Sequence, residues 1–295
     1  MRKPTTVEVM LLSAIGLWAL NLTFSRYILT HGFQPLAYST VRYGLASLVF
    51  IAIVAVAERS FRMSRADFLV VVACGVVVWI NQIGFVYSLK TTSASVIALI
   101  MGATPIFAAL IGLAFGTEVL PTRFWLGAGL SLAGVALVAV GTREQLSGDL
   151  RGILYGLGTA ATWAVYSILV TPLMRRYSAS RISALVLPIS WIGIAIVGWP
   201  QTSSQDWDLG WEVWVLLVAA TLGPLVTTNI LWFRSLDRIG PSRATLATNL
   251  QPFLAAIVAV VLLGEHMNLV QVLGGVLIGA GILAARRRAA VSPGE

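Results

Sequence analysis

Long apolar stretches follow one another along almost the whole chain, with short polar connections between them. A helix needs about 20 mostly apolar residues to cross the ~30 Å hydrocarbon core of a membrane. The connections leave little chain for a soluble domain. The pattern therefore predicts ten transmembrane helices, at about residues 7–30, 36–57, 68–89, 93–116, 121–141, 151–172, 180–199, 212–233, 242–263 and 268–285.

The composition agrees with this pattern. Apolar residue types make up 58% of the 295 residues and charged residues 11%, against about 25% charged in an average soluble domain. Arg2 and Lys3 imitate the start of a signal peptide. The apolar stretch after them continues to Leu29 without a small-residue cleavage site, so we interpret it as a retained first helix.

Lysines and arginines are divided unequally between the two sides of the predicted bundle. With the N-terminus inside, fifteen of the 20 fall on the inner side and four on the outer side, while Arg42 lies within the second helix. Loops rich in Lys and Arg stay in the cytoplasm. We therefore expect a multi-pass protein of a bacterial inner membrane with both termini in the cytoplasm.

The second half of the chain repeats the first at an offset near 147 residues. Each half, 1–147 and 148–295, holds five predicted helices. Because five is odd, the second half enters the membrane from the opposite side, which is the inverted-repeat plan of many secondary transporters. The residues that recur in register are Pro105, Glu118, Gly127 and Gly134, matched by Pro252, Glu265, Gly274 and Gly281.

This duplicated block, together with the stretch VRYGLA at 41–46, resembles the drug/metabolite transporter superfamily and, within it, the ten-span EamA-type exporters. The resemblance covers essentially the whole chain. It implies an all-α membrane protein whose two inverted five-helix repeats form a basket-like bundle around a central cavity. It also implies that the cavity is lined largely by the first, third, fourth, sixth, eighth and ninth helices, and that the solutes are amino acids, other metabolites or drugs.

Several predicted helices carry polar and aromatic residues three or four positions apart, which places them on one face. Polar groups inside a membrane normally face protein or a water-filled cavity. Instead of lining a cavity, the polar residues could form hydrogen bonds between helices, and the tryptophans could pack in the core. The candidates for substrate binding are Trp18, Asn21, Asn81, Gln82, Trp163, Tyr166, Asn229, Trp232, Asn249 and Gln251.

Five further residues are candidates for conformational or coupling roles. Pro105 and Pro252 lie at the centres of their helices and each removes a backbone donor, which predicts either a fixed kink or a hinge. Arg42 lies ~10 Å inside its helix and either snorkels outward or attracts a substrate carboxylate. Glu118 and Glu265 lie at the ends of their helices, where each either anchors the helix end or acts as a protonatable gate. No acid lies at mid-membrane, so the sequence favours gradient-driven movement without a proton relay.

Glycines gather in the fifth and tenth helices, where small residues allow close helix packing. The first interpretation is contact between the two repeats, and the second is the interface of a weak homodimer. The residues are Gly127, Gly134 and Gly141, with Gly274, Gly275, Gly279 and Gly281 in the tenth helix.

Catalytic motifs are missing from the sequence, which has no HExxH, CxxC or Walker lysine and a single cysteine, Cys74. We therefore predict no enzyme activity, metal or cofactor, and no nucleic-acid partner. The expected function is secondary transport of a small amphipathic metabolite, with amino-acid export first. The alternatives are a proton-coupled drug or multidrug exporter and a membrane receptor or scaffold.

Overall fold

The computed structural model describes residues 6–91, 97, 100–116, 119–141, 150–263 and 268–285. Within these ranges every regular element is a helix, and no strand occurs. In a lipid environment a helix pairs its own backbone N–H and C=O groups, and so a chain this apolar can cross a membrane as helices.

The described residues of the first half form five α-helices and one π-helical turn. They are α1 (Thr6–Thr30), α2 (Pro35–Ile53) with η1 (Val54–Glu58), α3 (Arg65–Thr91), α5 (Thr104–Ala114) and α6 (Thr122–Gly141). The second half contains α7 (Leu150–Met174), α8 (Ala179–Ser203), α9 (Trp211–Thr221), η2 (Leu222–Thr227), α10 (Thr228–Ile239), α11 (Pro241–Ala247), η3 (Thr248–Leu250), α12 (Gln251–Leu263) and α13 (Leu269–Ala285).

Seven helical segments in the described ranges are long and apolar enough to span a membrane. Shorter apolar helices cover Ile100–Ala114 and Leu269–Ala285. The seven are Thr6–Thr30, Pro35–Glu58, Arg65–Leu89, Thr122–Gly141, Leu150–Met174, Ala179–Ser203 and Trp211–Ile239.

Three of the expected helices differ from continuous rods. The fourth has a turn at Ala103 before α5 begins, and the ninth is divided into α11, the 3₁₀ turn η3 and α12. Pro105 and Pro252 each occupy the second position after such a break, where proline is tolerated because no intrahelical donor is needed. The eighth is interrupted by the π-helical turn η2 around Pro224, a break that the apolar pattern alone did not predict.

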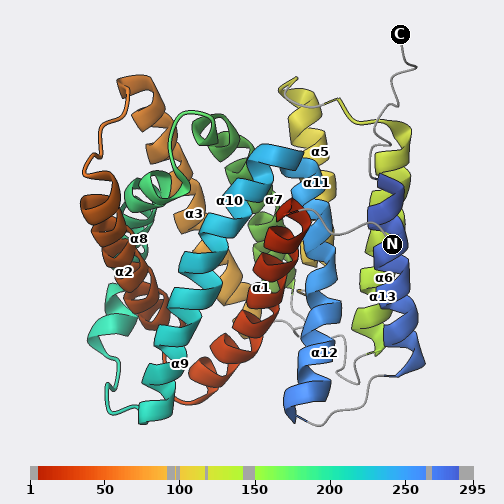
Figure 1. The fold of residues 1–295 in the computed structure, drawn as a ribbon. Helices are drawn as coiled ribbons and strands as arrows, with labels where there is room; N and C mark the ends of the chain where they lie inside the picture. Colours follow the sequence, from red (N-terminus) through yellow and green to blue (C-terminus); the bar gives the residue numbers. More distant parts are fainter. Residues whose placement is uncertain are drawn as a thin grey trace.

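The helices form two facing walls, and a pair of further helices closes the bundle along each lateral edge of these walls (Figure 1). The first wall consists of α10, α1 and α12, with α1 between the other two, and the second consists of α3, α7 and α5, with α7 between the others. The pair α2 and α8 closes one lateral edge of the two walls. The pair α6 and α13 closes the other.

Glycines allow α6 and α13 to pack backbone against backbone. A Cβ added at Gly134 would lie 2.7 Å from the carbonyl oxygen of Gly274, and one added at Gly274 would lie 2.7 Å from that of Gly134. Gly127 and Gly281 approach each other in the same way. By contrast, a Cβ at Gly129 or Gly279 would meet nothing within 4 Å. Gly127, Gly134, Gly274 and Gly281 therefore serve this contact, and Gly141 also lies close to α13, where an added Cβ would be 2.6 Å from the Gln271 side chain.

One end of the bundle, here called the arginine-rich end, joins the two halves of the chain through ion pairs and hydrogen bonds. Asp67 at the start of α3 accepts hydrogen bonds from Arg176 Nη1 at 2.8 Å and Tyr177 Oη at 2.9 Å, both just beyond α7. Ser64 Oγ donates to the same carboxylate at 2.7 Å. Nearby, Arg181 pairs with Glu58 at 2.9 Å.

We expect Asp67→Ala to lower the unfolding temperature, because it removes the acceptor shared by Ser64, Arg176 and Tyr177. Thermal unfolding in detergent micelles would measure the loss. Asp208→Ala is the matched control, since Asp208 is exposed in the connection before α9. Equal stability of the two variants would show that the hydrogen bonds of Asp67 do not stabilise the protein.

Candidate functional site

The three tryptophans predicted to bind substrate meet in the middle of the bundle. Trp18 of α1 lies with its ring centroid 5.5 Å from that of Trp163 of α7 and 5.0 Å from that of Trp232 of α10. Tyr166 continues the cluster at 5.6 Å from Trp163. Trp232 is fully buried, whereas Trp18 and Trp163 are half-buried. The four rings therefore join the two walls across the centre.

The helix directions place predicted carboxamides on one side of these rings. Helices α1 and α10 are antiparallel, because the start of α1 and the end of α10 line the same pocket. Asn21 follows Trp18 by three residues and Asn229 precedes Trp232 by three. Both therefore lie about one helical turn, ~5 Å, farther from the arginine-rich end than the tryptophans.

Asn81 extends this layer on the second wall. Its Nδ2 donates to the carbonyl oxygen of Thr159 at 2.8 Å and to Oγ1 of Thr162 at 3.0 Å. Thr159 precedes Trp163 by four residues on α7, which runs toward the arginine-rich end. Asn21, Asn81 and Asn229 are called the carboxamide layer below.

Asn21 and Asn229 differ from the other predicted carboxamides because most of their hydrogen-bonding groups have no partner among the described residues. Asn229 is 6% exposed, and the described structure gives its side chain no hydrogen-bond partner. Asn21 accepts only a long bond from Ser25 Oγ, at 3.4 Å. Neither side chain has an atom among the fully buried polar atoms that lack a partner, so their amide groups remain open to a further hydrogen bond. A solute with its own donors and acceptors would satisfy them.

Gln82 and Gln251 are held by other groups. Gln82 accepts from Tyr43 Oη at 3.1 Å and donates to Ser39 Oγ at 3.1 Å, which ties α3 to α2. Gln251 Nε2 donates to the Trp18 carbonyl oxygen at 3.4 Å, so it lies beside the aromatic cluster.

Asn249 links the two broken helices. Its Nδ2 donates to the carbonyl oxygen of Gly102 at 3.2 Å and to Ser131 Oγ at 3.0 Å, and its Oδ1 is buried without a partner. Gly102 precedes Pro105 by three residues, as Asn249 precedes Pro252. The structure thus places Asn249 at the meeting point of the two breaks, away from the carboxamide layer.

Arg42 does not snorkel, because it is only 5% exposed. Its Nη2 donates to the carbonyl oxygen of Ala220 at 3.2 Å, and its guanidinium carbon lies 5.7 Å from the centre of the Tyr38 ring. Glu118 and Glu265, the other two predicted gating residues, lie outside the described residues.

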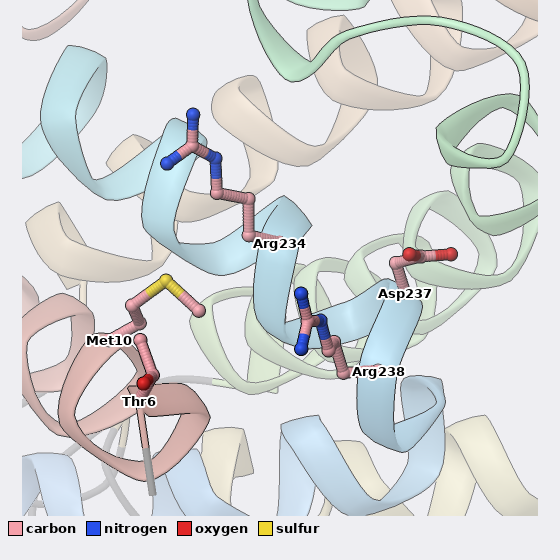
Figure 2. Close-up of a pocket in the computed structure, with 5 residues that line it drawn as sticks. All are labelled: Thr6, Met10, Arg234, Asp237 and Arg238. Atoms are coloured by element: carbon pink, nitrogen blue, oxygen red, sulfur yellow. The ribbon is translucent and has the colours of Figure 1, made fainter.

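Two pockets of the described surface lie away from the carboxamide layer. One of ≈ 400 Å³ lies between the start of α1 and the end of α10 and is lined by Thr6, Met10, Arg234, Asp237 and Arg238. Figure 2 shows Arg238 directed into the space between these helices and Asp237 turned away from α1. Another, of ≈ 570 Å³, surrounds Phe61 and Phe68. Neither includes a predicted substrate-binding residue.

Contacts between the walls are concentrated in one half of the bundle. In the part of the chain that the structure describes, α10 of the first wall contacts α7 of the second and also α8, while α11, which precedes α12, contacts α5 and α7. The end of α10 and the following α11 lie in the half of the bundle near the arginine-rich end. Trp163 against Trp232 and Tyr166 against Phe233 are examples, with centroids 6.2 and 6.1 Å apart. That half is therefore closed by aromatic packing.

Comparison with known proteins identifies the chain. The model of the EamA-like transporter family matches residues 5–140 and, separately, residues 150–287. The chain belongs to the EamA-like transporter family. This EamA-like protein is thus a multi-pass member of a transporter family, as the duplicated sequence block predicted.

Relatives of this EamA-like protein carry names of the same kind. "Uncharacterized transporter YyaM" of Bacillus subtilis is 25% identical, over 96% of this chain and 94% of that one. "Uncharacterized transporter YdfC" of the same organism is 28% identical, over 65% of this chain and 62% of that one. A crystal structure of a protein 19% identical aligns with a TM-score of 0.78, covering 95% of this chain and 96% of the other, and shows the fold.

Sequence patterns missed several residues around the site. Pro224 was visible as a proline inside an apolar helix, and its effect on Ala220 could have been inferred from the missing N–H. Asp67 and Arg176 are far apart in the sequence, and no local signal pairs them. The hydroxyls of Ser25 and Ser131 become recognisable as partners of asparagines only once the helices are packed.

Proposed function

We propose that this protein is a secondary transporter that exports a small amphipathic metabolite, with amino acids as the first class, by alternating access. The observation that carries this proposal is the carboxamide layer beside the tryptophan cluster. Aromatic faces suit the apolar part of a solute, and partly free amides suit its polar part. The substrate site is therefore the layer of Asn21, Asn81 and Asn229 together with Trp18 and Trp163.

Ten membrane helices in two inverted repeats, 1–147 and 148–295, form the proposed framework. The two separate family matches support it. So does the packing, because contacts recur in pairs: α3 with α7 corresponds to α10 with α1, and α5 with α7 corresponds to α12 with α1. Asn249 and Gly102, which are bonded to each other, are 147 residues apart, the repeat offset itself.

The arginine-rich end is proposed to face the cytoplasm of a bacterial cell. It carries Arg62, Arg176, Arg181, Arg234 and Arg238, as cytoplasmic loops do. Exposed tryptophans at the opposite end, Trp199 and Trp211, suit a membrane interface. With aromatic packing across the arginine-rich half, this conformation is closed to the cytoplasm, and the carboxamide layer faces the other side.

Alternating access requires the arginine-rich half to open. We propose that the breaks before Pro105 and Pro252 act as hinges, because each divides a helix at the level where Asn249 bonds Gly102. Discontinuous helices at the midplane mark the binding region of many transporters. Coupling to protons is disfavoured, since every acid in the described ranges lies in a connection or near a helix end.

Counterflow in proteoliposomes tests the proposal. Purified protein, reconstituted with a panel of amino acids and other metabolites, should exchange labelled amino acid at a rate unaffected by an imposed pH gradient. Acceleration by a proton gradient would favour a proton-coupled exporter, with Glu118 and Glu265 as candidates. An absence of flux for every compound would favour a receptor or scaffold.

A further inference from the structure

Arg42 is a buried cation without a negative partner. It lies about ten ångströms inside the bundle, counted from the start of α2 at 1.5 Å per residue, and is 5% exposed. The ion pairs of the described residues, Arg176 with Asp67 and Arg181 with Glu58, lie at the arginine-rich end. A buried charge is costly unless it is paired. The position of Arg42 therefore calls for a compensating anion.

The hydrogen bond of Arg42 explains how the side chain is held. Pro224 has no N–H, so the carbonyl oxygen of Ala220, four residues earlier, lacks its helical donor. Arg42 Nη2 donates to this oxygen at 3.2 Å. Among the described residues, the remaining contacts bring no anion to the guanidinium, because Nε has no partner and the other neighbour is the face of the Tyr38 ring.

Polar groups connect Arg42 to the carboxamide layer. The Tyr38 hydroxyl, whose ring faces the guanidinium, lies 3.0 Å from Ser25 Oγ, and Ser25 bonds Asn21. In a low-dielectric interior, a cation attracts an anion over several ångströms. The field of Arg42 therefore acts on a solute bound beside Asn21.

We propose that Arg42 supplies the positive charge that selects a carboxylate on the transported metabolite, an inference that rests on the transport function proposed above. The apolar side chain of the solute lies against the tryptophan cluster, its amino group bonds the carboxamide layer, and its carboxylate is directed toward Arg42. The substrate class is thus an α-amino acid with an apolar side chain.

Competition between acids and their amides tests this inference. Unlabelled L-phenylalanine and L-leucine should inhibit counterflow of the transported solute at least tenfold more strongly than phenylalaninamide and leucinamide, which lack the carboxylate. Arg42→Met should reduce this preference to less than threefold, and Arg42→Lys, which keeps the charge, should retain most of it. Equal inhibition by acid and amide in the unaltered protein would overturn the proposal without any variant.

Pro224→Ala separates charge from structure. The alanine restores an N–H for the Ala220 carbonyl, so a purely structural Arg42 becomes dispensable. If Arg42 selects the carboxylate, the double variant Arg42→Met/Pro224→Ala regains stability but still does not distinguish acid from amide. Recovery of the full preference in the double variant would contradict the proposal. An absence of flux for all compounds would instead defeat the transport function itself.

Discussion

Gly134→Leu is expected to lower the stability of the protein by about 3 kcal/mol or more. At this position an added Cβ would lie 2.7 Å from the carbonyl oxygen of Gly274 and equally close to the Ile278 nitrogen, so α6 and α13 would have to separate. Overpacking costs about 1–3 kcal/mol where side chains can move aside, and backbone atoms cannot. Thermal unfolding in micelles would show the loss.

Gly129→Leu is the control for this prediction. Gly129 lies on the same helix, is exposed, and its added Cβ would meet nothing within 4 Å. The same leucine should therefore leave the unfolding temperature nearly unchanged. If Gly129→Leu destabilised the protein as much as Gly134→Leu, the loss would reflect the removal of glycine and not the contact with α13.

Asn229→Ala is expected to weaken substrate binding about tenfold, which corresponds to one lost hydrogen bond of about 1.4 kcal/mol. Stability should hardly change, because the described structure gives the Asn229 side chain no partner to lose. Concentration-dependent counterflow gives the apparent affinity, and thermal unfolding of the same preparation gives the stability.

The opposite behaviour is expected of Asn268→Ala. Asn268 Nδ2 donates to the Gly141 carbonyl oxygen at 2.6 Å, between the end of α6 and the start of α13. Its loss should reduce stability and leave the apparent affinity intact. The two variants thus separate a binding role from a structural one. Unchanged affinity in Asn229→Ala would remove this residue from the site.

The sequence alone is enough to predict where the membrane helices lie, but it predicts much less of the substrate site. Apolar length predicts a membrane helix because lipid forces the backbone to pair within the segment. The breaks in helices depend on single residues: Pro105 and Pro252 were recognised, whereas the π-helical turn around Pro224 also required a donor from another helix, Arg42.

Facing residues are harder to predict, because spacing along one helix does not tell which neighbour a side chain meets. The predicted Trp18, Trp163 and Trp232 do come together. Asn249, chosen by the same reasoning, instead bonds the break at Gly102. Among the glycines, Gly275 packs against Phe253 and Gly279 faces open space, so the two glycines of this GxxxG pair do different things.

Thiol labelling tests the central claim, a substrate site that opens to one side at a time. Cys74, the single cysteine, is first replaced by alanine, and a cysteine is introduced at half-buried Gln251, beside Trp18. A membrane-impermeant maleimide should label it from the side opposite the arginine-rich end, and bound substrate should slow the reaction at least fivefold. Labelling from the arginine-rich side in the absence of substrate, or at a rate that substrate does not change, would contradict the account.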